Sequence, residues 1–91
     1  MNQTAKHIIF AGRVQGIGFR FTALDIANRY RLTGLVRNLP EGTVEMIAQG
    51  PSDDIADCIR DIKEAFEGYI RETKTEEIPP DPKYTDFKIT F

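Results

Sequence analysis

The chain has 91 residues, which is enough for one hydrophobic core and too short for two of ordinary size. We therefore expect a single domain over residues 1–91. A hydrophobic content of 41% and a charged content of 29% are typical of globular proteins and argue against a disordered or fibrous chain. The net charge of -2 argues against general nucleic-acid binding, since nucleic-acid binders gather a basic excess on one face.

Localisation and cofactor content are predicted from the same composition. No apolar run approaches the roughly 20 residues of a membrane-spanning helix, and residues 1–6 lack a secretory apolar region, so we expect a soluble, cytoplasmic protein that does not bind membranes. The single cysteine, Cys58, and the single histidine, His7, are a thin basis for a metal site. We expect no metal and no organic cofactor, a buried Cys58 thiol, and His7 at the start of a strand.

The spacing of apolar residues, with turn-forming residues between the runs, predicts seven elements. In chain order they are a strand at 7–11, a helix with its apolar face from 23 to 30, strands at 35–38 and 43–48, a helix at 52–66, and strands at 69–78 and 87–91. We expect Gly34 to close the first helix in the left-handed conformation and Ser52 to cap the second helix. Residues 39–42 have turn chemistry and predict a hairpin between the strands that flank them.

The order strand, helix, strand, strand, helix, strand is that of the split β-α-β arrangement, in which two helices cover one face of an antiparallel sheet. We expect this α+β fold, with the polar segment 69–78 as an extra, exposed strand and 87–91 as the last strand of the basic arrangement. The fold class alone does not identify the chemistry, because this arrangement serves many functions.

Candidate chemistry begins in the glycine-rich segment 12–20, which joins the first strand to the first helix. Unpaired backbone N–H groups and the helix dipole favour an anion at a helix start, and glycines let the backbone approach it closely. The planar guanidinium of Arg20 is suited to clasp two phosphate oxygens. The sequence has neither the nucleotide-binding P-loop nor the dinucleotide G-x-G-x-x-G, and the glycines alone are equally compatible with a structural turn.

Two segments carry a resemblance to a known family. Residues 12–20, Gly-Arg-Val-Gln-Gly-Ile-Gly-Phe-Arg, resemble the first signature of the acylphosphatase family. Residues 34–38, Gly-Leu-Val-Arg-Asn, followed by Gly-Thr-Val at 42–44 and by Gly50, resemble the second. Two separate signatures in the correct order are specific, and with the predicted elements the resemblance covers nearly the whole chain.

The resemblance implies a ferredoxin-like α/β sandwich in which Arg20 binds the substrate phosphate and Asn38 orients the attacking water. It also implies a loop wrapped around that phosphate, with the phosphate-binding residues Gln15, Gly16, Ile17, Gly18, Phe19 and Arg20. Leu35 departs from the family pattern, which usually has an aromatic residue after the glycine that matches Gly34. The resemblance therefore does not predict how Leu35 packs or how it affects the catalytic rate.

Taken singly, neither proposed catalytic residue requires a function. Arg20 alone fits a solvent-exposed arginine at a helix start, and Asn38 alone fits a turn residue tolerant of unusual backbone angles. Together, an arginine in an anion-ready loop and an asparagine on a strand able to lie beside it favour function. We interpret Arg13 and Arg37 as mainly peripheral electrostatic or structural residues.

The sequence offers no catalytic group of residues built on a histidine or cysteine nucleophile, and the reaction implied by the resemblance does not require one. A carboxylate is a good leaving group near neutral pH, and phosphoryl transfer depends chiefly on positioning and charge stabilisation. The expected activity is hydrolysis of the carboxyl–phosphate anhydride of a small-molecule acyl phosphate by direct in-line attack of water, with no cofactor.

Two other functions stay open at this point. A non-catalytic or accessory module of the same family would bind an acyl or carbamoyl phosphate and turn it over poorly, and its loop would look similar. A ferredoxin-like RNA-binding or protein-interaction domain is less favoured, because the acidic balance and the missing K/R-G-F/Y motif oppose RNA binding. A monomer is the default expectation, because the sequence has no coiled-coil repeat and no second apolar stripe.

Overall fold

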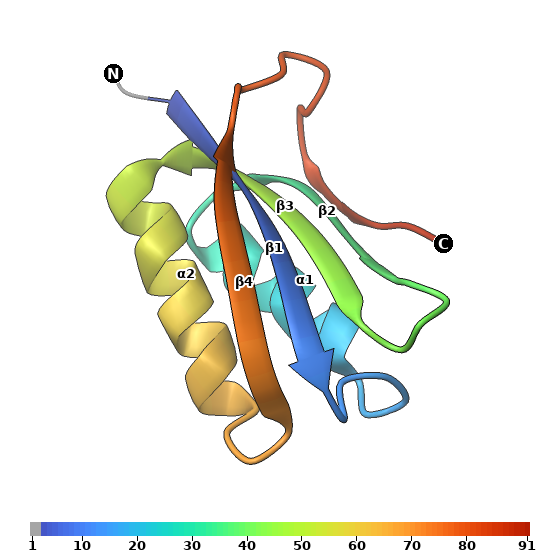
Figure 1. The fold of residues 1–91 in the computed structure, drawn as a ribbon. Coiled ribbons are helices and arrows are strands. Elements are labelled where there is room, and N and C mark those ends of the chain that lie inside the picture. The colour runs from blue at the N-terminus through green and yellow to red at the C-terminus, as the bar shows by residue number, and fades with distance from the viewer. Residues whose placement is uncertain (1–2) are drawn as a thin grey trace.

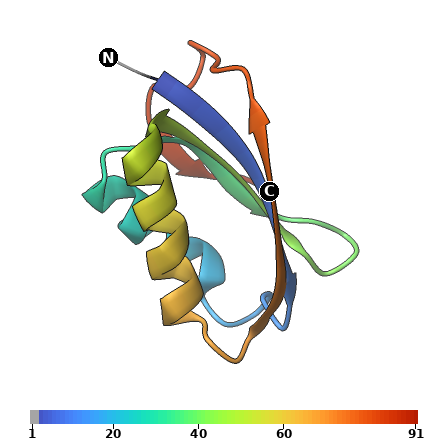
Figure 2. The same cartoon turned by 60° about the vertical axis from the view of Figure 1, so that its left-hand side comes forward.

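The computed structural model describes residues 3–91 and shows two helices packed on one face of a five-stranded sheet (Figures 1 and 2). In chain order the elements are β1 (Gln3–Gly12), α1 (Phe19–Arg29), β2 (Thr33–Asn38), β3 (Val44–Pro51), α2 (Ser52–Ala65), β4 (Ile70–Ile78) and β5 (Phe87–Ile89). The predicted α+β, ferredoxin-like sandwich is confirmed. Met1 and Asn2, which belong to the expected domain of residues 1–91, lie outside the described residues.

The sheet order is β4-β1-β3-β2-β5, so β1 is an interior strand and lies between strands from much later in the chain. β1 pairs antiparallel with both β3 and β4, and β2 pairs antiparallel with β3 as the predicted hairpin. β5 instead runs parallel to β2, over residues 34–36, so the sheet is mixed rather than wholly antiparallel. This direction arises because segment 79–86 crosses one end of the sheet and brings the chain back to the start of β2 (Figure 1).

The last two strands have the opposite roles to those expected. The segment predicted as an extra strand forms β4, which pairs along most of β1 and completes the split β-α-β arrangement. The terminal segment forms only the three-residue β5 at the other edge of the sheet, and this is the extra strand. The prediction was wrong because β4 is an exposed edge strand with mostly polar side chains, whereas the terminal segment has the apolar alternation of a core strand.

Two predicted helix ends are also wrong. After α1 the left-handed residue is Arg31 (φ 57°), not a glycine, and Gly34 lies inside β2. A Cβ at Gly34 would lie 1.8 Å from the carbonyl oxygen of Ile47 on β3, so the close approach of two strands requires glycine here. α2 begins at Ser52 itself, after an extended Pro51, and no side chain caps its first turn.

The core lies between the two helices and the face of the sheet that they cover. Its buried side chains alternate along the strands and recur at helical spacing; they include Ile8, Phe10, Val36, Val44 and Met46 from strands, and Phe19, Ala23, Ile26, Ile55, Cys58 and Ile62 from helices. Within residues 3–91, neither helix is long and apolar enough to cross a membrane. The packing holds the start of α1 against the end of the sheet where β1 and β2 terminate (Figure 1).

Candidate active site

The segment between β1 and α1 forms an open loop whose shape depends on two glycines. Gly16 and Gly18 have φ angles of 79° and 80°, in the left-handed region that glycine favours. No heavy atom lies within 4 Å of a Cβ built at either position, so the loop backbone is accessible from outside. Gly18 also serves as the N-cap of α1, which places the loop at the positive end of the helix dipole.

The N–H groups of this loop and of the first helical turn have no acceptor among residues 3–91. The first helical hydrogen bond comes from the N–H of Thr22, which donates to the carbonyl of Gly18 at 3.1 Å. Within the part of the chain that the structure describes, no hydrogen bond is donated by the backbone of residues 15–21. Such a group of N–H donors at a helix start is suited to bind an anion, and phosphate in particular.

Gln15 fixes the loop to the β2–β3 hairpin. Its side-chain amide donates to the carbonyl oxygens of Leu39 at 2.8 Å and Thr43 at 2.9 Å, which occupies both of its N–H groups. The side chain is therefore engaged in the fold, and only the backbone N–H of Gln15 remains for an anion. Because Asn38 immediately precedes this hairpin turn, the same two hydrogen bonds hold Asn38 next to the loop.

Arg20 and Asn38, which are distant in the chain, line one cavity of about 90 Å³. Arg20 lies in the first turn of α1, and Asn38 is the last residue of β2. The complete lining is Val14, Gly16, Gly18, Phe19, Arg20, Phe21 and Asn38. Of the residues predicted to bind phosphate, the structure brings Gly16, Gly18, Phe19 and Arg20 together here, whereas Gln15 and Ile17 are outside the lining.

The amide oxygen of Asn38 is buried and accepts no hydrogen bond from the described residues. Buried polar atoms are paired in the great majority of cases, because an unpaired one costs roughly 1–3 kcal/mol. The exception here borders a cavity that also contains an arginine and free N–H groups. Asn38 therefore lines the cavity and has an acceptor that no described residue uses.

The charge of Arg20 is not neutralised by a carboxylate. The ion pairs among residues 3–91 do not include Arg20, and its guanidinium instead lies 5.2 Å from the centroid of the Phe91 ring. An aromatic face leaves the N–H groups at the guanidinium edge free to donate. The N–H groups of Arg20 are thus not used by a carboxylate of residues 3–91, and the guanidinium is suited to a bidentate contact with an oxyanion.

The other two arginines of the signatures lie outside the cavity lining, in agreement with their expected peripheral roles. Arg13 lies 5.3 Å from the ring centroid of Tyr69. Arg37 donates to Glu45, which also accepts a 2.8 Å hydrogen bond from His7. Burial alone would raise the pKa of Glu45, but the hydrogen bonds from His7 and Arg37 outweigh it and hold that pKa below its usual value.

The cysteine cannot supply a nucleophile near neutral pH. Cys58 is buried as predicted, and burial, reinforced by the charge of Asp61, raises the pKa of its thiol to about 12. It lies on α2, away from the cavity lining. Within residues 3–91, no three His, Cys, Asp or Glu side chains are close enough to share a metal ion.

Sequence reasoning missed two residues of the cavity lining, Val14 and Phe21. Val14 is a buried core residue, and its position in a glycine-rich loop gave no sign of burial. Phe21 carries a detectable signal, because it is a large apolar residue that falls outside the apolar face of α1, where Phe19, Ala23 and Ile26 are buried.

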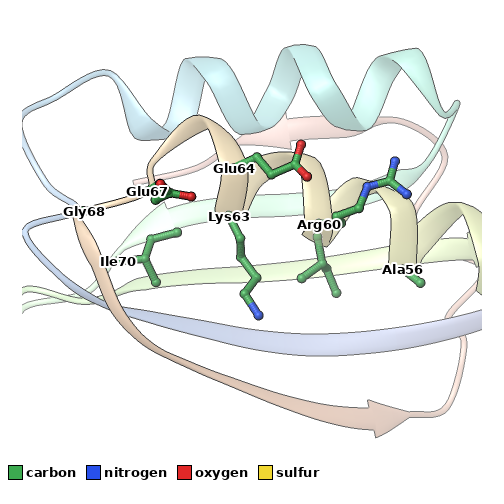
Figure 3. A pocket seen from close by; sticks show the side chains of 8 residues that line it. Ala56, Arg60, Lys63, Glu64, Glu67, Gly68 and Ile70 are labelled. Atoms are coloured by element: carbon green, nitrogen blue, oxygen red, sulfur yellow. The ribbon is translucent and has the colours of Figure 1, made fainter.

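A larger hollow, of about 470 Å³, lies between α2 and the start of β4 (Figure 3). Its lining is Ala56, Ile59, Arg60, Lys63, Glu64, Glu67, Gly68 and Ile70. The charged side chains are of both signs and are exposed, and none of the unpaired buried polar atoms in residues 3–91 belongs to this lining. We place the chemistry in the smaller cavity, because reactive groups and not volume distinguish a site.

Known proteins resemble this chain over almost its whole length. The acylphosphatase family model matches residues 6–89. An acylphosphatase of Chlorobaculum tepidum is 40% identical over 90 residues, which cover 98% of each chain. The crystal structure of acylphosphatase from Bacillus subtilis aligns with a TM-score of 0.89 at 29% identity, over 97% of this chain and 99% of that one. Full-length HypF in its phosphate- and nucleotide-bound form aligns over 99% of this chain but only 12% of its own, at 33% identity and a TM-score of 0.85.

Proposed function

This chain belongs to the acylphosphatase family, and from that premise we propose how its cavity at the start of α1 performs the reaction. The activity is hydrolysis of the carboxyl–phosphate anhydride of an acyl phosphate to a carboxylate and inorganic phosphate. In our proposal Arg20 holds the phosphoryl group and Asn38 orients the attacking water. The observation that supports this assignment is that Arg20 and Asn38 line one cavity and that the amide oxygen of Asn38 has no partner among the described residues.

The phosphoryl group binds to the backbone N–H groups of the loop and to Arg20. These N–H groups have no acceptor within the described residues and lie at the positive end of the α1 dipole. Arg20 adds a fork of charge-assisted hydrogen bonds, free of competing carboxylates. Both sets of donors are in position before substrate arrives, so they stabilise the equatorial oxygens in the transition state with little reorganisation.

The attacking water is held by Asn38. The amide oxygen accepts a hydrogen bond from the water and directs the water's oxygen at phosphorus, in line with the bond to the leaving carboxylate. A new oxygen–phosphorus bond forms as the old one breaks, and the carboxylate leaves with the bonding electron pair. An amide is not a base, so the water proton passes to a phosphoryl oxygen of the substrate. No acid is needed for a leaving group that is stable as an anion.

Two substitutions separate binding from water positioning. We expect Arg20→Lys to weaken competition by inorganic phosphate and to lower kcat/KM about 100-fold or more, because one ammonium cannot reproduce a planar fork. We expect Asn38→Ala to lower kcat by about 100- to 1000-fold and to change the inhibition constant of phosphate less than about threefold. The assay is hydrolysis of benzoyl phosphate, with circular dichroism to verify folding.

Arg37→Lys is the matched control, because Arg37 belongs to the same signature but pairs with Glu45 outside the cavity lining. It is expected to keep kcat/KM within about twofold of the unsubstituted protein. A folded Arg20→Lys or Asn38→Ala protein with the rate of this control would contradict the role assigned to that residue.

A second candidate function is a phosphate-binding module with little turnover. It is favoured by one observation, namely that the same fold forms a small part of the much longer HypF chain. A protein that binds inorganic phosphate but leaves benzoyl phosphate intact would support this alternative. Action as a cytoplasmic monomer that binds neither nucleic acid nor membranes is part of our proposal and is supported by composition alone.

A further inference from the structure

The cavity at the start of α1 is too small for a whole acyl phosphate. Its volume of about 90 Å³ is well below the roughly 300–1,000 Å³ of pockets that enclose an organic ligand. We therefore expect the organic part of the substrate to extend out of the cavity, against the residues at its mouth.

The mouth of the cavity is unusually apolar. Among residues 3–91, four large hydrophobic side chains are exposed: Ile17, Phe21, Tyr69 and Phe91. Phe21 is 66% exposed and lines the cavity, Phe91 is 96% exposed with its ring against the Arg20 guanidinium, and Ile17 lies between the two loop glycines. Phe21 therefore lies at the cavity and Phe91 lies beside Arg20, while Ile17 belongs to the loop whose glycines border the cavity. Scattered exposed hydrophobic residues are ordinary, but a cluster around a cavity marks a binding surface.

The fold does not explain why Phe21 is apolar. The buried face of α1 is formed by Phe19, Ala23, Ile26 and Ala27, and Phe21 lies on the solvent side between them. A polar residue at this position would preserve the same core and the same helix. An exposed phenylalanine that borders the anion cavity is instead suited to contact the organic group of a bound phosphoryl compound.

We infer that Phe21 and Phe91, with Ile17, form an apolar rim that receives the organic group attached to the phosphoryl group, and that the substrates are acyl phosphates with an apolar or aromatic acyl group. The second part of this inference rests on the proposed function. A small or polar acyl group, such as acetyl, leaves the rim in contact with water. A flat aromatic acyl group covers the exposed ring of Phe21, so that apolar surface of both the protein and the substrate is removed from water.

Non-hydrolysable phosphonates test the rim independently of catalysis. The probes are inorganic phosphate, methylphosphonate and benzylphosphonate, and the measurement is the dissociation constant of each by NMR titration. We expect the protein to bind benzylphosphonate about five- to tenfold more tightly than methylphosphonate, from the apolar area that the ring covers. Phe21→Ala should reduce this ratio to about twofold or less and leave the phosphate dissociation constant unchanged, and Phe91→Ala should reduce it in part.

Tyr69→Ala is the matched control, because Tyr69 is the fourth exposed large hydrophobic residue and lies outside the cavity lining. It should retain the full preference for benzylphosphonate. The inference is overturned if Phe21→Ala keeps the ratio of the unsubstituted protein, or if it weakens phosphate and both phosphonates by the same factor. In the second outcome Phe21 supports the anion site rather than contacting the organic group.

Hydrolysis of acetyl and benzoyl phosphate then separates the inference from the proposed function. We expect Phe21→Ala to raise KM for benzoyl phosphate about three- to tenfold and to change KM for acetyl phosphate less than about twofold. A benzyl preference in binding without hydrolysis of either compound would contradict the proposed function and support the rim. Hydrolysis of both compounds with equal dependence on Phe21 would support the function and contradict the rim.

Discussion

The two ends of the sheet each contain a buried side-chain amide, and the two amides are used in opposite ways. At one end Gln49 is only 7% exposed, and its amide pairs with the backbone of Asp81, accepting at 2.8 Å and donating at 3.0 Å. At the other end the amide oxygen of Asn38 is buried and has no partner within the described residues. The two amides thus differ in their pairing, and we propose that the paired one serves the fold and the unpaired one serves the reaction.

The paired amide has a clear structural purpose. Gln49 holds segment 79–86 at the end of the sheet where β4 stops, and this segment brings the chain to β5 (Figure 1). The Asn38 amide shows no such purpose, since its oxygen has no hydrogen-bond partner among residues 3–91 and the residue lines the same cavity as Arg20. Substitutions at the two positions should therefore affect different properties, which allows the comparison to be tested.

The largest expected effect is on turnover in Asn38→Ala. We expect kcat to fall about 100- to 1000-fold while the free energy of unfolding stays within about 0.5 kcal/mol, because the deleted oxygen makes no hydrogen bond with residues 3–91. The measurements are benzoyl phosphate hydrolysis and urea denaturation. A large loss of stability would show that the amide has a structural partner after all.

Gln49→Ala should show the reverse pattern. Removal of its amide leaves the N–H and carbonyl of Asp81 without their partner, so we expect a loss of about 1–3 kcal/mol in the free energy of unfolding. We expect kcat/KM to stay within about twofold, because the loop that Gln49 anchors lies at the opposite end of β3 from the cavity. If kcat/KM fell by the factor predicted for Asn38→Ala, the two amides would not be functionally distinct.

Gln15→Ala should give an intermediate result. The side chain stabilises the turn through Leu39 and Thr43 and at the same time positions the loop against Asn38. We expect a loss of about 1 kcal/mol in stability and about a tenfold fall in kcat, with KM less affected, because a small displacement of the water-binding group is costly. The control is Thr43→Val, which keeps the backbone carbonyl that Gln15 contacts and should keep its kcat. An equal fall in kcat for both variants would contradict a specific positioning role of the Gln15 side chain.

The smallest expected effect concerns acid pH and the hydrogen bonds of Glu45. Its pKa is lower in the folded protein than in the unfolded chain, so its stabilising contribution is present above the unfolded value of about 4.3 and is lost as the pH falls through the folded value. We expect Glu45→Gln to cost less than about 1 kcal/mol at pH 7, and this difference to shrink at pH 3.5, with kcat unchanged at pH 7. Urea denaturation at pH 7 and pH 3.5 measures the difference in free energy of unfolding between the two proteins. A difference that is larger at pH 3.5 than at pH 7 would contradict the prediction.

Much of the fold was predictable because burial repeats with a simple period. The alternation of Val44, Met46 and Ala48 and the helical spacing of Ile55, Cys58 and Ile62 identified core faces that the structure contains. The roles of the last two strands were not predictable in this way, since β4 packs its polar side chains at an edge. The strands with which β4 and β5 pair depend on where the chain lies after α2 and after segment 79–86. The local sequence of each strand does not encode that position.

The candidate site was predictable only in part. The positions of Arg20 and Asn38 came from a resemblance to family signatures, and the cavity they share became visible only in three dimensions. Gln15 appeared as a phosphate-binding residue, because sequence cannot show that two carbonyls of a distant turn already occupy its amide. Phe21 was overlooked, because an exposed apolar residue is unremarkable until its neighbours are known.

The position of β1 between two strands from later in the chain has a consequence for how the chain folds. Its neighbours β3 and β4 begin only at Val44 and Ile70, so none of the hydrogen bonds between strands that involve β1 is local in sequence. Chains with many such distant pairings fold toward the slower end of the range for small domains. During synthesis at about 5–20 residues per second, the apolar strand that carries Ile8 and Phe10 leaves the ribosome seconds before either partner exists.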